Sequence, residues 1–131
     1  MTRFLVYGIL TAVLSSTAVG VYLHYFYAME FDESFKVMPI WRVISIYCSI
    51  ALVSGIVVYW VNKKFQFKGV LMLNVLVVLV SIASIGLPIT YVNSEIDTTF
   101  LPVAAIPAHF ILPLVWLGLQ PFLFISKKTQ L

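Results

Sequence analysis

The chain has 131 residues, of which 62% are hydrophobic and 10% are charged, and its formal net charge at pH 7 is +3. So few charged side chains cannot cover a water-facing surface, which excludes a soluble helical protein. The single cysteine excludes a disulfide framework and a Cys-x-x-Cys redox pair. The basic residues form no cluster beside aromatic ones, so we expect no nucleic-acid partner.

The apolar residues fall in four long segments, and the charged residues lie almost entirely between them. The segments cover residues 4–28, 40–62, 69–91 and 103–125. Each supplies the roughly 20 apolar residues that a helix needs to cross about 30 Å of hydrocarbon. They are too long and too uniformly apolar for the strands of a membrane barrel. We therefore predict an all-α, single-domain protein over residues 1–131, built as a four-transmembrane-helix bundle.

The charges between the segments predict the orientation of the bundle. One side carries basic residues, namely Arg3, Lys63, Lys64, Lys68, Lys127 and Lys128. The other side carries acidic residues, namely Glu30, Asp32, Glu33, Glu95 and Asp97. Only Lys36 and Arg42 are basic residues on the acidic side, each near acidic residues that offset it. Because basic residues in short loops stay inside, we predict cytoplasmic N- and C-termini and a bacterial plasma (inner) membrane location.

The first apolar segment resembles a signal peptide at its start. Arg3 precedes an apolar run, and the small residues of 15–18 are of the kind at which a signal peptidase cuts. The run continues without a break through residues 19–28, which is too long for a signal sequence. We therefore expect an uncleaved first helix.

A row of small residues, which we call the small-residue row, recurs at intervals of four in this segment: Gly8, Ala12, Ser16 and Gly20. Such a row lies on one helix face and lets another helix approach closely in lipid. It is either a docking face for a partner or a second copy, or a packing face inside the bundle. Ala51 and Gly55 in the second segment offer a similar surface that would fit against it.

The short connector at residues 63–68 predicts that the second and third helices are antiparallel neighbours, with Gly69 leaving room for the turn. Polar residues and prolines share one side of each of the last two segments. They are Asn74, Ser81, Ser84 and Pro88 in the third, and His109, Pro113, Trp116 and Gln120 in the fourth. We expect these faces to meet, with Asn74 hydrogen-bonded to Gln120, and Pro88 and Pro113 to bend or end their helices.

Three ionisable residues, His24, Arg42 and His109, should lie at the outer boundary of the membrane. Ionisable groups at this depth need partners, so a ligand site formed by these residues is one interpretation. The other is an interfacial belt of tyrosine and tryptophan, with Arg42 reaching the lipid headgroups. The histidines and the cysteine show no metal-ligand spacing, and we predict neither a metal site nor a cofactor.

Some residues resemble those of an uncharacterised family of small four-helix bacterial membrane proteins. The shared features are the run Tyr59–Lys64, Ser81 and Ser84 followed by Pro88, and the pair Ala108–His109. The resemblance implies inward termini and a histidine of unknown role, and it implies no activity. Small multidrug transporters are similar in size, but they need an acidic residue in the first span, and residues 4–28 contain none.

Three functional classes fit these observations. We favour a non-catalytic accessory or assembly subunit, whose partners are the lipid bilayer and either other integral membrane subunits or a second copy. The alternative is a small transporter or a lipid- or hydrophobe-binding protein with an outer-leaflet site near His109. A membrane enzyme ranks last, because the sequence shows no nucleophile–base pair and no carboxylate pair at useful spacing.

Overall fold

The computed structural model describes residues 1–29 and 33–124, and these contain helices and no strand. This confirms the all-α class. The helices are α1 (Thr2–Ala28), α2 (Ser34–Val37), α3 (Ile40–Ser84), α4 (Gly86–Thr90), α5 (Leu101–Leu119) and α6 (Pro121–Phe124). Four charged residues of the predicted topology, Glu30, Asp32, Lys127 and Lys128, lie outside the described residues.

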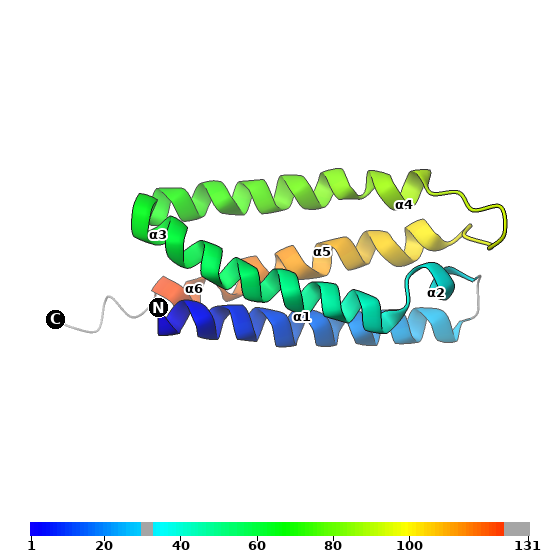
Figure 1. Ribbon diagram of the computed structural model, residues 1–131, viewed down its shortest axis with the longest axis horizontal. Helices are drawn as coiled ribbons and strands as arrows, with labels where there is room; N and C mark the ends of the chain where they lie inside the picture. The colour runs from blue at the N-terminus through cyan, green and yellow to red at the C-terminus, as the bar shows by residue number, and fades with distance from the viewer. Residues whose placement is uncertain (30–32, 125–131) are drawn as a thin grey trace.

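Helix α3 folds back on itself at Gln66, so that its two halves run in opposite directions (Figure 1). Gln66 has φ 54° and ψ −149°, and the positive φ breaks the helical path there. We call residues 40–65 the first arm of α3 and residues 67–84 its second arm. A Cβ atom on Gly69 would lie 2.5 Å from the Cβ of Phe65 and 2.9 Å from a methyl of Val61. Glycine at position 69 therefore leaves room for the turn, as the sequence predicts, although Gln66 makes the reversal.

Three helical stretches of the described chain are long and apolar enough to cross a membrane: Thr2–Ala28, Ile40–Thr90 and Leu101–Leu123. This indicates an integral membrane protein. The middle stretch has 51 residues. At 1.5 Å per residue it would extend for about 77 Å, more than twice the roughly 30 Å of a bilayer core. Only the reversal at Gln66 divides this stretch into lengths that fit a bilayer, and the number of crossings stays a prediction.

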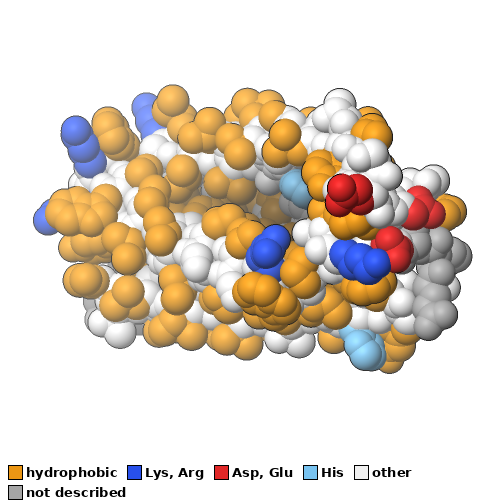
Figure 2. Space-filling model, turned by 45° about the vertical axis from the view of Figure 1, so that its right-hand side comes forward, with side chains coloured by type: hydrophobic (Ala, Val, Ile, Leu, Met, Phe, Trp, Pro, Cys, Tyr) orange, Lys and Arg blue, Asp and Glu red, His pale blue; other side chains and the backbone are white. Residues whose placement is uncertain are grey.

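The two ends of the molecule differ in charge. The start of α1, the reversal of α3 and α6 lie at one end, which we call the turn end, while α2 and the connection 91–100 lie at the other, the loop end (Figure 1). In Figure 2, the left end carries basic side chains and no acidic ones, whereas all the acidic side chains in view lie at the right, with basic ones beside them. Among the described residues, therefore, the charge separation seen in the sequence survives as a separation in space.

The small-residue row of α1 packs inside the molecule, against the first arm of α3. A Cβ on Gly8 would lie 3.3 Å from the carbonyl oxygen of Ala51 and 3.3 Å from the Cα of Gly55. Ala12 is buried, and the Ser16 hydroxyl lies 3.1 Å from the sulfur of Cys48. Gly20 faces the side chain of Ile44. The contacts of the small-residue row in this structure are therefore with α3, which fits the interpretation of the row as a packing face inside the bundle.

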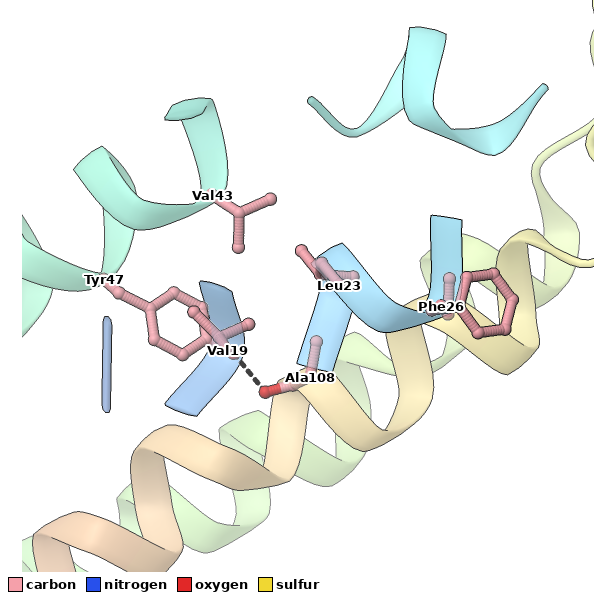
Figure 3. Packing of buried hydrophobic residues seen from close by; sticks show 7 residues of the cluster. Val19, Leu23, Phe26, Val43, Tyr47 and Ala108 are labelled. Carbon is pink, nitrogen blue, oxygen red and sulfur yellow. Dashed lines mark hydrogen bonds between the residues drawn. The ribbon is translucent and has the colours of Figure 1, made fainter. Parts of the chain in front are cut away.

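Two buried clusters hold α1, α3 and α5 together. The cluster toward the loop end contains Val19, Leu23, Phe26, Val43, Tyr47, Ala104 and Ala108. Figure 3 shows the packing of this cluster, with Val19, Leu23 and Ala108 close together and a hydrogen bond from the Tyr47 hydroxyl to the Ala108 carbonyl. The cluster toward the turn end contains Tyr7, Val58, Val70, Trp116 and Leu123. The packed core therefore lies around α1 and α5, and the second arm of α3 contributes little to it.

Prolines make the helices at the loop end irregular. Helix α3 ends at Ser84, four residues before Pro88, because a proline ring clashes with the carbonyl four residues earlier. Pro107, inside α5, has no N–H to donate to Val103, and the Tyr22 hydroxyl donates to that carbonyl instead, at 2.7 Å. Tyr7 likewise donates to the Trp116 carbonyl, at 2.7 Å. Tyrosines of the neighbouring helices thus satisfy backbone carbonyls of α5 and hold it in place.

Candidate functional site

A cavity of about 620 Å³ lies between the two arms of α3, and α5 closes it from below. We call it the arm cavity. Its apolar lining comes from Ile46 and Ile50 on the first arm, Leu76, Val77 and Val80 on the second, and Ala108 and Leu112 on α5. Figure 2 shows a hollow near the middle of one face of the molecule, with hydrophobic side chains around much of it. The two arms join at the turn end, and the residues of α3 that line the cavity lie far from that junction. The cavity therefore lies toward the loop end.

The arm cavity brings together two of the three ionisable residues that the sequence singled out. Arg42 and His109 both line it, although they lie on different helices and 67 positions apart in the chain. Arg42 is exposed and His109 is half-buried, which places the arginine at the mouth. His24 does not line the cavity: it is exposed on α1, beside the ring of Tyr25. The structure therefore separates His24 from the other two.

The polar groups inside the arm cavity already bond to the backbone. The hydroxyls of Ser81 and Ser84 donate to the carbonyls of Val77 and Ser81, at 2.9 and 2.8 Å. The Nδ1 of His109 lies 2.7 Å from the Ala105 carbonyl, and since a carbonyl only accepts, Nδ1 carries the proton. Tyr47 donates to Ala108. The walls of the cavity are therefore mainly apolar, and the hydroxyls of Tyr47, Ser81 and Ser84 and the Nδ1 of His109 already have hydrogen-bond partners.

A second hollow, of about 350 Å³, continues the arm cavity toward the turn end. Ile50 and Val77 line both spaces, so the two follow one another along the arms. The lining of the second hollow is almost entirely apolar, with Val53, Val57 and Leu73 from the arms and Trp116 from α5. Together the two spaces form one long apolar groove, which we call the arm groove.

Asn74, Trp116 and Gln120 form a hydrogen-bonded group that joins the second arm of α3 to α5. The side-chain amides of Asn74 and Gln120 bond reciprocally, one of these bonds being 2.7 Å long, and the Trp116 indole N–H donates to Asn74 at 3.0 Å. The sequence predicted the contact between Asn74 and Gln120, and the structure confirms it. The group holds the Trp116 ring in place where it lines the arm groove, toward the turn end.

Removing this group should loosen the second arm. We expect Asn74→Leu and Gln120→Leu each to lower the free energy of unfolding by about 1 kcal/mol, because a polar pair between membrane helices contributes roughly that much. The double variant should lose less than the sum of the two, because each single variant already breaks the pair. Unfolding of the four proteins in detergent with denaturant measures this. Additive losses would contradict a direct interaction between the two amides.

Glu95 and Asp97 lie in the connection between α4 and α5 and do not line the arm cavity. The backbone N–H and the hydroxyl of Thr99 donate to the Asp97 carboxylate, at 3.1 and 2.7 Å, and hold the pKa of that carboxyl below its ordinary value. Lys36 is paired with Glu33, as expected. Arg42 has no carboxylate partner among the described residues, and because Glu30 and Asp32 lie outside them, the expectation that a nearby acid offsets Arg42 stays a prediction.

The possible metal ligands of the described chain do not cluster, and its cysteine forms no disulfide. No group of three His, Cys, Asp or Glu side chains there could hold a metal ion. Cys48 is a free cysteine whose described polar neighbour is Ser16.

Sequence reasoning missed the apolar walls of the cavity and the role of Tyr47. Ile46, Val80 and Leu112 look like any other lipid-facing residues in the sequence, because nothing in a uniformly apolar segment marks one face as facing a cavity. For Tyr47 a signal existed. Val43 and Tyr47 continue, at intervals of four, the row of Ala51 and Gly55, and all four are buried. A row that packs on α1 at one end can be expected to stay on that side at the other.

Comparison with protein-family models, with curated proteins and with solved structures finds no match for this chain. The resemblance noted from the run Tyr59–Lys64 and from His109 therefore adds no activity to what the residues show.

Proposed function

We propose that this protein is a four-span membrane protein of a bacterial inner membrane, with cytoplasmic termini, that binds a hydrophobic ligand in the arm cavity. The observation that carries the proposal is the cavity itself. Its volume of about 620 Å³ lies within the range of about 300–1,000 Å³ that is typical of small-molecule sites. Its walls are mainly apolar with a few polar groups, as such sites usually are.

The four-span topology is supported by the reversal of α3 and by the charges of the described residues. Lys63, Lys64 and Lys68 flank Gln66, at the end of the molecule where α1 begins. A lysine at the centre of a bilayer costs about 3 kcal/mol, so these three residues favour a turn outside the membrane. Basic residues near short turns also favour the cytoplasmic side for the turn end.

An accessory or assembly subunit is the other function that the sequence suggested. The small-residue row of Gly8, Ala12, Ser16 and Gly20 was its proposed docking face. In the structure the first arm of α3 covers this row, so a partner would need a different surface. The small size and short loops of the chain still fit that function, but no contact among the described residues favours it over ligand binding.

A variant that fills the cavity tests the proposed function. The probe is a long-chain fatty alcohol that carries a photoactivatable diazirine, added to vesicles that contain the protein. We expect adducts on residues of the cavity in the wild type. Ile46→Trp places a large ring in the cavity and should reduce these adducts by about tenfold or more, a factor that corresponds to at least about 1.4 kcal/mol. Peptide mass spectrometry locates and counts the adducts.

Ile56→Trp is the matched control. Ile46 and Ile56 lie on the same arm and are 49% and 48% exposed, but Ile56 does not line either hollow. The control should label like the wild type. The proposed function fails if adducts are spread evenly over the lipid-facing surface, or if Ile46→Trp labels as strongly as Ile56→Trp.

A further inference from the structure

We infer that the ligand is a long-chain fatty acid whose carboxylate binds Arg42 and whose hydrocarbon chain lies in the arm groove. This inference rests on the proposed function, since it names the ligand of the same cavity. Three independent observations support this ligand: the charge at the mouth, the hydrogen bonding inside the cavity and the length of the groove.

The mouth of the arm cavity is positively charged. Arg42 lines the cavity and is exposed, and the described lining contains no aspartate and no glutamate. The described ion pair at this end joins Lys36 to Glu33 and leaves Arg42 out of it. The Arg42 guanidinium lies 5.6 Å from the centre of the Trp41 ring, an interaction that leaves its N–H groups able to donate. A guanidinium binds a carboxylate through two parallel hydrogen bonds, so the mouth suits a carboxylate.

The interior of the cavity offers few free hydrogen-bonding groups to a ligand. Tyr47, Ser81, Ser84 and the Nδ1 of His109 are hydrogen-bonded to backbone carbonyls. A ligand rich in polar groups would lose its bonds to water and find few replacements here. A hydrocarbon chain needs none. The cavity therefore suits a molecule whose polar atoms are confined to the end that meets Arg42.

The arm groove is long and runs in a single line. From Arg42 at the mouth to Val57 in the second hollow, the first arm rises about 22 Å at 1.5 Å per residue. This exceeds half of the roughly 30 Å hydrocarbon core, so the groove can hold an acyl chain as long as one leaflet. The two hollows follow one another along the arms and share Ile50 and Val77. One chain placed end to end fits this arrangement, whereas a phospholipid brings two chains side by side.

The test compares two diazirine probes of equal chain length, a fatty acid and the corresponding fatty alcohol, in vesicles of a zwitterionic phospholipid. We expect the acid to label the wild-type arm groove more strongly than the alcohol does. Arg42→Gln should reduce labelling by the acid about tenfold and change labelling by the alcohol less than twofold. Arg42→Lys keeps the charge but loses the paired hydrogen bonds, and should restore labelling only in part. Lys36→Gln, which removes a basic residue that does not line the cavity, should label like the wild type.

Three results would overturn the inference, and they can be told apart. If acid and alcohol label the groove equally and Arg42→Gln changes neither, the ligand is hydrophobic but not anionic, and the proposed function stands. If unlabelled dioleoyl phosphatidate displaces the acid probe better than oleate does, the ligand is a phospholipid. If neither probe labels the groove, the proposed function itself fails.

Discussion

Replacing Gly55 by leucine is expected to force α1 away from α3 and to lower the free energy of unfolding by about 3 kcal/mol or more. A Cβ at this position would lie 2.8 Å from the carbonyl oxygen of Phe4 and 2.9 Å from the Cα of Gly8. Both are backbone atoms, which cannot move aside as the end of a side chain can. Overpacking of a core commonly costs about 1–3 kcal/mol. Because leucine at position 55 would clash with the backbone of α1, we expect its cost to reach or exceed the upper end of that range.

The measurement is thermal and denaturant unfolding of the purified protein in detergent, together with its elution as a single species. Gly118→Leu is the matched control, because a Cβ at Gly118 has no atom within 4 Å. It should unfold like the wild type. Gly20→Ala should have a small effect, because the nearest atom is the Cδ1 methyl at the end of the Ile44 side chain, at 3.2 Å. If Gly55→Leu is as stable as Gly118→Leu, the packing of α1 on the first arm is wrong.

Cysteine labelling is expected to give an all-or-none difference between the two ends of the molecule. In a Cys48→Ser background, Glu95→Cys should react with an impermeant maleimide on intact cells. Lys64→Cys and Thr2→Cys should react only after the membrane is opened. All three positions are exposed in the structure, so access of the reagent depends on the membrane and not on burial.

The same three positions distinguish the proposed topology from one with three crossings. If residues 40–90 crossed once as a single stretch, Thr2 and Glu95 would lie on the same side and Lys64 would lie within the membrane. Labelling of Thr2→Cys and Glu95→Cys on the same side would therefore exclude the four-span proposal. Protection of Lys64→Cys even after the membrane is opened would do so as well.

Several contacts of the fold could be predicted from residue type and spacing. Gly8 and Gly55 stand in rows of small residues at intervals of four, and in lipid such rows bring helices together. Asn74 and Gln120 are amides within apolar segments, and an amide in hydrocarbon needs a partner. A small residue in such a row allows another helix backbone to lie against it, and an amide in hydrocarbon requires a hydrogen-bonding partner. Each of these residues therefore restricts which side chains can lie opposite it on the neighbouring helix. The site was harder to predict, because Arg42 and His109 are unusual residues whose neighbours depend on the path of three helices.

The sequence by itself determined the helical class, the apolar segments and the separation of charge between the two ends. These follow from local properties, namely length, hydropathy and the cost of charge in lipid. Only the tertiary structure decided that Gln66 reverses α3, that His109 and not His24 joins Arg42, and that the arms of α3 leave a groove between them. Those features depend on how helices diverge and rotate against each other, and the apolar residues that line the groove, such as Ile46 and Leu112, look in the sequence like residues that face lipid.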